Sequence, residues 1–177
     1  MFACFFLIDI NEGMAKFYGG EERGVIELFT SALEGHEKPS NRILNLLARS
    51  HSDLEQHEEA VDYFTEAIAV RDDSFNRTWR AMQYFGNEDC HLAFTDADKA
   101  LGTNPYVETG FDTRVQSLLI RGHCGEFQGQ AKKAVADIGE AIRLAPNSDY
   151  SQAEIDYLRG EHQAWLQVAI EDRGGSP

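Results

Sequence analysis

The sequence predicts an all-α fold, an α-solenoid of stacked antiparallel helix pairs with a C-terminal capping helix. A helical motif that ends in alanine recurs four times, and a small residue stands at a fixed distance before each copy. The composition suits such an array. Of the 177 residues, 42% are hydrophobic and 11% aromatic, which is too apolar for a disordered chain and sufficient for a buried core.

The recurring motif places three small or apolar residues on one helix face, because its spacing of four and then three residues follows the helical period. The four copies are Val25/Phe29/Ala32, Ala60/Phe64/Ala67, Ala93/Ala97/Ala100 and Ala134/Ile138/Ala141. Their terminal alanines are 35, 33 and 41 residues apart. The repeat period is therefore close to 34 residues, with an insertion of about seven residues before the last copy.

A small residue also stands nineteen residues before each terminal alanine, at Gly13, Ala48, Ala81 and Gly122. A small side chain there lets a preceding helix cross close to the motif helix. Each copy therefore belongs to a pair of amphipathic helices, and stacked pairs bury a continuous core that no pair could form alone.

These repeats resemble the tetratricopeptide repeat family over about residues 6–148. The family pattern Trp-x2-Leu-Gly-x2-Tyr is partly met by Leu44, Leu47, Ala48 and His51, and again by Leu118, Gly122 and Gly125. The third repeat instead carries Arg77 and Arg80 where the family usually has apolar residues. The resemblance implies a superhelix of about four repeats within residues 1–148, at 6–39 (divergent), 41–73, 74–106 and 115–148.

We expect nine helices, at 6–17, 21–35, 41–53, 57–70, 75–86, 90–102, 113–126, 130–144 and 151–171. The last helix forms a capping segment at 149–171, because apolar side chains share one of its faces and polar ones the other. The apolar face consists of Ile155, Leu158, His162, Trp165, Leu166 and Ala169. We expect residues 172–177 to form a flexible tail.

The insertion at 106–114 has two interpretations. Insertions in repeat arrays often form loops on the binding face. A tolerated surface extension is the other interpretation, because added loop length costs little free energy.

Sixteen basic residues against 30 acidic ones give a formal net charge of −14. Nucleic-acid binding depends on Lys and Arg at the phosphates, and an anionic membrane surface repels carboxylates, so both are disfavoured as partners. Cys4, Cys90 and Cys124 are an odd number without close spacing. They predict reduced thiols in a cytoplasmic protein.

The N-terminal run from Met1 to Ile8 is apolar but too short to span a membrane, and it lacks the basic segment of a signal peptide. A buried terminal helix is one expectation. Self-association through Phe2, Phe5, Phe6, Leu7 and Ile8 is a second hypothesis. A third is that translation starts at Met14, so that residues 1–13 do not belong to the native protein.

No motif indicates catalysis, a metal or another cofactor. Cys90-His91 and His123-Cys124 lack the spacing of a zinc site. Gly122-x2-Gly125-x3-Gly129 lies within and after an expected helix rather than after a strand, as nucleotide-binding glycines would. We therefore expect a protein that is not an enzyme.

The family resemblance implies that the first helix of each repeat lines a concave groove for a protein or peptide partner. Projected onto this chain, the groove contains Arg42, Asn45, Arg49, Phe75, Thr78, Trp79, Met82, Phe85, Gln116, Leu119, His123 and Phe127. Some family members bind the acidic C-terminal tails of heat-shock chaperones through Lys, Asn and Arg. The corresponding places here hold Asn45, Arg49, Trp79, Gln116 and Ile120, which do not match that set.

The resulting prediction is a scaffold or adaptor that holds a peptide or helix in this groove, with Phe75, Trp79, Met82 and Phe85 around an apolar stretch of the partner. Burial of these aromatic side chains in the core is the competing interpretation. A ligand- or metal-sensing regulatory module associated with an enzyme, built around His123 and Cys124, is the alternative function.

Overall fold

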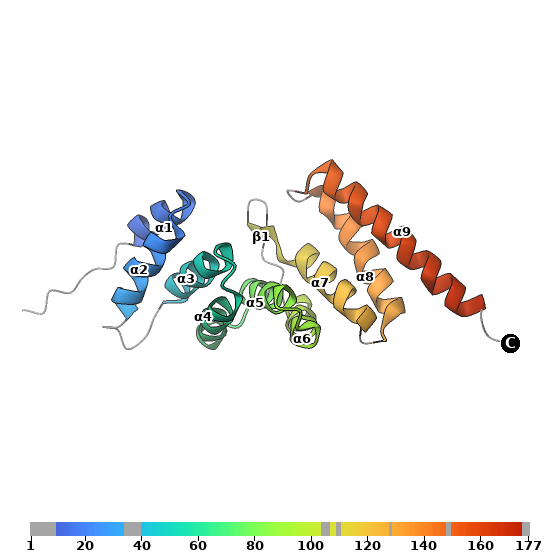
Figure 1. The fold of residues 1–177 in the computed structure, drawn as a ribbon, viewed down its shortest axis with the longest axis horizontal. Coiled ribbons are helices and arrows are strands. Elements are labelled where there is room, and N and C mark those ends of the chain that lie inside the picture. The colour runs from blue at the N-terminus through green and yellow to red at the C-terminus, as the bar shows by residue number, and fades with distance from the viewer. Residues whose placement is uncertain are drawn as a thin grey trace, which may run out of the picture. The chain divides into compact units, whose positions relative to one another are not determined.

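The computed structural model describes residues 10–33, 40–103, 107–108, 111–127, 129–147 and 150–174. Within these ranges the chain forms nine α-helices, a two-stranded hairpin and one 3-10 turn, which confirms the all-α prediction (Figure 1). The helices are α1 (Ile10–Tyr18), α2 (Glu22–Leu33), α3 (Asn41–Asp53), α4 (His57–Val70), α5 (Ser74–Gly86), α6 (Cys90–Leu101), α7 (Thr113–Phe127), α8 (Ala131–Leu144) and α9 (Gln152–Gly174).

The chain forms two compact units, residues Met1–Asp72 and Asp73–Pro177. The first contains the α1–α2 and α3–α4 pairs. The second contains the α5–α6 and α7–α8 pairs followed by α9. Successive helices within each unit pack side by side, as the alanine motif predicts.

Polar side chains fix where several helices begin. Ser40 accepts a hydrogen bond from the Ile43 amide at 3.3 Å, and Asp73 accepts one from the Asn76 amide at 2.9 Å. Asp89 does the same for α6, accepting from the Leu92 amide at 3.1 Å. Each cap satisfies a backbone donor that has no partner within its helix.

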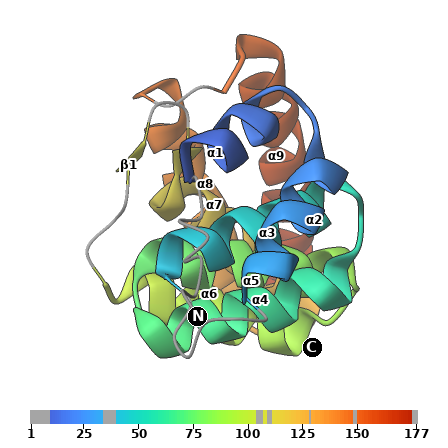
Figure 2. The ribbon, with the colours of Figure 1, turned by 90° about the vertical axis from the view of Figure 1, so that its left-hand side faces the viewer.

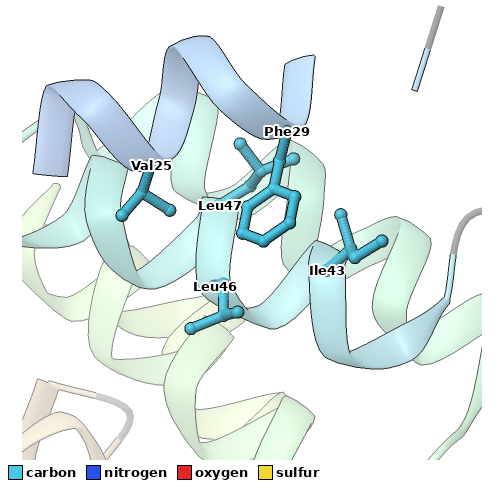
Figure 3. Close-up of a cluster of buried hydrophobic side chains, with 5 residues drawn as sticks. All are labelled: Val25, Phe29, Ile43, Leu46 and Leu47. Atoms are coloured by element: carbon cyan, nitrogen blue, oxygen red, sulfur yellow. The ribbon is translucent and has the colours of Figure 1, made fainter. Parts of the chain in front are cut away.

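The core of the first unit lies between α2 and α3. Val25 and Phe29 of α2 point toward Ile43, Leu46 and Leu47 of α3, and Val25, Phe29 and Leu47 are completely buried (Figure 3). A Cβ atom at Gly13 of α1 would overlap the Phe29 ring, so this position admits only glycine. The small residue of the divergent first repeat therefore has the packing role expected of it.

In the second unit, Ala81, Ala93, Ala97, Ile120 and Cys124 form one buried cluster between α5, α6 and α7. A second cluster joins α7 and α8 to the capping helix and consists of Val115, Leu118, Leu119, Ala141 and Leu158. The alanines of the motif are fully or almost fully buried in both pairs, so they allow the close helix packing that the spacing predicts.

Helix α9 packs on α8 through Ile155 and Leu158, and the His162 ring nitrogen donates to the Val135 carbonyl at 3.0 Å. Leu166, expected on the buried face, is 38% exposed. The helix also continues to Gly174, beyond the expected end at residue 171. The side chains of Trp165 and Ala169 lie outside the described residues.

The insertion before α7 contains an antiparallel hairpin rather than an irregular loop. Strand β1 (Val107–Glu108) pairs with β2 (Phe111–Asp112), with Val107 opposite Asp112. The Asp112 carboxylate then accepts from the Arg114 amide at 2.8 Å, at the start of α7. In both ribbon views α7 and α8 lie between this hairpin and α9 (Figure 1 and Figure 2). No helix in the described ranges has the length and apolar run needed to cross a bilayer.

Candidate functional site

The first helices of the third and fourth repeats, α5 and α7, lie side by side in the second unit. The hydroxyls of Thr78 and Ser117 share a hydrogen bond of 2.8 Å between the two helices. Farther along, the Phe85 ring lies 6.0 Å from the His123 ring, measured between centroids. The structure therefore brings Phe85 of α5 and His123 of α7, both predicted site residues, close together.

Only some of these residues have surface available to a partner. Phe75 is 7% exposed, Thr78 is fully buried and Leu119 is 8% exposed. Leu119 belongs to the α7–α8–α9 cluster. Neighbouring elements cover these three side chains, so they belong to the packed interior and offer little surface to a partner.

The accessible part of the face is formed by Trp79, Met82, Phe85 and His123, which we call the Phe85 patch. Phe85 is 41% exposed, and the other three are half-buried. Met82 also packs against the buried α5–α6–α7 cluster, so it connects the patch to the core. The side chain of Phe127, also predicted here, lies outside the described residues.

Gln116, another predicted residue, is occupied within the second unit. Its side-chain amide donates to the Tyr150 hydroxyl at 2.5 Å. Burial raises the pKa of Tyr150 to about 12, so this phenol keeps its proton at neutral pH.

The remaining predicted residues, Arg42, Asn45 and Arg49, belong to α3 in the first unit, and two of them contact α1. The Arg42 guanidinium contacts the Met14 sulfur, and the Arg49 guanidinium lies 4.5 Å from the centre of the Phe17 ring. Asn45 is half-buried. These contacts hold α1 on α3, and we treat the three residues apart from the Phe85 patch.

The unexpected arginines of α5 have a structural explanation. Asp96 of α6, 2% exposed, accepts from Arg77 Nη1 at 2.7 Å and from Arg80 Nε at 2.6 Å. The positive charge that departs from the family pattern is therefore paired with a buried carboxylate. No role was predicted for Asp96, although it follows Arg80 by sixteen residues, as Asp137 follows Arg121.

Arg121 joins the same kind of pair in the fourth repeat. It donates to Asp137 from Nε at 2.7 Å and to Asp98 from Nη1 at 2.6 Å, and the hydrogen bond to Asp137 raises its pKa. Burial opposes ionisation of Asp98, but hydrogen bonds from Arg121 and Lys133 outweigh it and lower the pKa of this carboxyl.

The prediction of three reduced thiols is wrong. Cys90 of α6 and Cys124 of α7 form a disulfide, with Cα atoms 5.0 Å apart. The two cysteines are 34 residues apart, about one repeat, and the stacking of the third and fourth repeats brings the start of α6 to the second half of α7. The prediction assumed that bonded cysteines would lie close together in the sequence. In stacked repeats, residues that are one repeat apart in the sequence become neighbours in space.

The disulfide also bears on the alternative of a metal-sensing module. Cys124 has no thiolate to offer a metal while it is bonded to Cys90. Among the described residues, no three His, Cys, Asp or Glu side chains gather as a ligand set.

The model of the tetratricopeptide repeat family matches residues 42–74 and 115–148, which correspond to the second and fourth repeats. A search of curated protein sequences found no match. The third repeat, with its arginine–aspartate pair, falls between the matched segments.

Solved structures resemble the fold along most of the chain. The crystal structure of MamA aligns over 92% of this chain and 94% of its own, with a TM-score of 0.65 and 16% identity. YrrB, described as a TPR protein with an unusual peptide-binding site, aligns over 89% and 76% with a TM-score of 0.68 and 17% identity. The first TPR domain of Spaghetti (RPAP3), bound to the HSP90 peptide SRMEEVD, aligns over 77% and 99% with a TM-score of 0.59 and 18% identity.

At these identities the likeness concerns the fold. No enzyme family is among the matches described above, and tetratricopeptide repeats are typically non-catalytic interaction modules. The family model therefore identifies tetratricopeptide repeats at residues 42–74 and 115–148. The successive helix pairs and the structural likenesses show that the rest of the aligned chain has the same fold.

Proposed function

We propose that this protein is a non-catalytic scaffold or adaptor that holds a segment of a partner protein against the Phe85 patch. The observation that carries the proposal is the 41% exposure of Phe85, whose ring lies beside the His123 ring. Aromatic side chains in well-packed surroundings often contribute most of the binding energy of a protein interface. The flexible methionine side chain can adapt to partners of more than one shape. Structural neighbours whose names mention bound peptides support the same class of function.

The charges around the patch favour an apolar segment with basic residues beside it. Glu88 and Asp89 are exposed in the turn that follows α5, within four residues of Phe85. Arg77, Arg80 and Arg121 are paired with Asp96 and Asp137. A formal net charge of −14 also steers a basic partner toward the protein.

An acidic chaperone tail such as the peptide bound to Spaghetti is a poorer fit. The clamp positions of the second unit hold Trp79, Gln116 and Ile120. Gln116 is engaged by Tyr150, and Ile120 is 5% exposed. These residues supply no cation for a terminal carboxylate.

The test is a selection from a displayed library of random peptides, followed by affinity measurements on the recovered peptides. We expect sequences that combine an apolar residue with Lys or Arg, and at least a tenfold weaker affinity for the Phe85→Ala variant. Leu92→Ala is the matched control, because Leu92 is 39% exposed but lies on α6. Peptides that bind Phe85→Ala and the unaltered protein equally would refute the proposal.

Two further expectations stay predictions. Self-association through the apolar N-terminus concerns residues 2–8, which lie outside the described residues. The cytoplasmic location is likewise retained only as a prediction.

A further inference from the structure

The disulfide between Cys90 and Cys124 has no part in the function proposed above, yet it lies directly beside the Phe85 patch. Its Cα separation of 5.0 Å is within the range that disulfides span without backbone movement. Cys124 is completely buried, whereas Cys90 is half-buried at the first turn of α6. We propose that this pair is a reversible redox site, which a dithiol reductant opens and a disulfide oxidant closes. Its redox state controls how rigidly the residues of the Phe85 patch are held.

The link to the patch is a short covalent path. Phe85 precedes Cys90 by five residues, and His123 is the neighbour of Cys124. The disulfide and the contact between the Phe85 and His123 rings, 6.0 Å apart, therefore close a small loop between α5 and α7. Two backbone hydrogen bonds stiffen its turn, from Glu88 N to Phe85 O at 3.0 Å and from Asp89 N to Tyr84 O at 2.8 Å.

We expect the fold to persist without the disulfide, because apolar packing also joins α6 to α7. Ala93 and Ala97 of α6 and Ile120 of α7 form a buried apolar cluster, which we expect to persist when the two sulfur atoms are not bonded. Small domains that need disulfides to fold lack such a core. Reduction is therefore expected to loosen the end of α7 against the α5–α6 turn while the helix pairs stay folded.

The exchange chemistry follows from the difference in exposure. A thiolate of the reductant attacks Cys90 Sγ, the bond to Cys124 breaks, and Cys124 leaves with the electron pair and takes up a proton. The second thiolate of the reductant then displaces Cys90, so that the dithiol loses two electrons and two protons and becomes a disulfide. Oxidation reverses both steps with a disulfide as the electron acceptor.

The first measurement counts thiols in the folded protein. After equilibration with an excess of oxidised glutathione, without denaturant, we expect a maleimide reagent to modify neither Cys90 nor Cys124. After treatment with dithiothreitol and removal of the reductant, it should modify both. A pair that stays unreactive until the protein is denatured, or that never forms in the oxidised protein, would overturn the redox proposal.

The second measurement follows hydrogen exchange by mass spectrometry in both redox states. We expect exchange to be roughly tenfold faster in residues 86–90 and 121–127 of the reduced protein, with α8 unchanged. The variant Cys90→Ser/Cys124→Ala should exchange like the reduced protein in either buffer, and Cys4→Ser should respond like the unaltered chain. Equal exchange of the oxidised and reduced proteins near Phe85 would overturn control of the patch.

Any effect on binding rests on the function proposed above, and the two can fail separately. If thiol counting and exchange behave as expected but no peptide binds in either state, the redox site stands and the peptide-binding role fails. If peptides bind the Phe85 patch but the cysteines do not respond in the folded protein, the binding role stands and the redox proposal fails.

Discussion

Arg121 binds Asp137 through two parallel hydrogen bonds, from Nε to Oδ2 and from Nη2 to Oδ1, each 2.7 Å long. Arg80 holds Asp96 in the same way, at 2.6 Å and 3.0 Å. The third and fourth repeats thus join their two helices with the same buried ion pair. The second repeat has Leu47 and Tyr63 at the equivalent positions, in an apolar cluster.

This equivalence predicts how the fourth repeat responds to substitution. Asp137→Ala leaves the half-buried Arg121 without its main partner, and we expect the free energy of unfolding to fall by about 3 kcal/mol. The double variant Arg121→Leu/Asp137→Tyr reproduces the second repeat and should stay within about 1 kcal/mol of the unaltered protein. Urea unfolding followed by circular dichroism measures both. A double variant that is less stable than Asp137→Ala would contradict the interchangeability of the two pairs.

Gly122 provides a second prediction, from the close crossing of α7 and α8. A Cβ atom at this position would lie 2.5 Å from Ile138 Cγ1, so Gly122→Ala should destabilise the protein by roughly 1–3 kcal/mol. The third repeat has Ala81 and Ala97 at the equivalent positions, and Gly122→Ala/Ile138→Ala should therefore relieve the overlap, although it loses buried apolar surface.

The matched control for this prediction is Gly160→Ala in α9, where an added Cβ meets no atom within 4 Å. This change should stabilise the protein slightly, by about 0.5 kcal/mol, because alanine favours the helix. A loss of stability in Gly160→Ala as large as that in Gly122→Ala would show that the crossing is not the cause.

Tyr150 predicts a change of stability at high pH. Its pKa in the folded state is about 12 because of burial, compared with an ordinary value of 10.0. Below pH 10 the phenol is protonated in both states and favours neither. Between about pH 10 and 12 the unfolded chain loses this proton while the folded protein keeps it, so stability falls as pH rises.

The measurement is the melting temperature across that pH range for the unaltered protein and for Tyr150→Phe. The variant loses the hydrogen bond from Gln116 and should be less stable near neutral pH, but its melting temperature should fall less steeply above pH 10. Parallel profiles would show that Tyr150 titrates normally in the folded state.

The helices were predictable because each depends on local spacing. The alanines of the second, third and fourth motif copies lie on the buried face where the spacing places them, and the expected helix ends are mostly within two residues of those observed. The hairpin at 107–112 was not expected, because two-residue strands leave no alternating pattern to detect.

The candidate site was less predictable, because helix position does not determine what covers a side chain. Thr78 and Leu119 have the spacing of groove residues, yet Ser117 hydrogen-bonds the first and the α8–α9 contacts bury the second. The link between Cys90 and Cys124 could have been inferred only by stacking two repeats and asking which residues then become neighbours.

The central claim is that a partner segment occupies the Phe85 patch of α5 and α7. Chemical-shift mapping of the isotope-labelled protein with a library-selected peptide tests it most directly. We predict that the largest shifts occur at the Trp79 indole and at the amides of Met82, Phe85 and His123, and that those of α6 and α8 move little. Shifts concentrated on α6 and α8, or within residues 10–72, would contradict the claim.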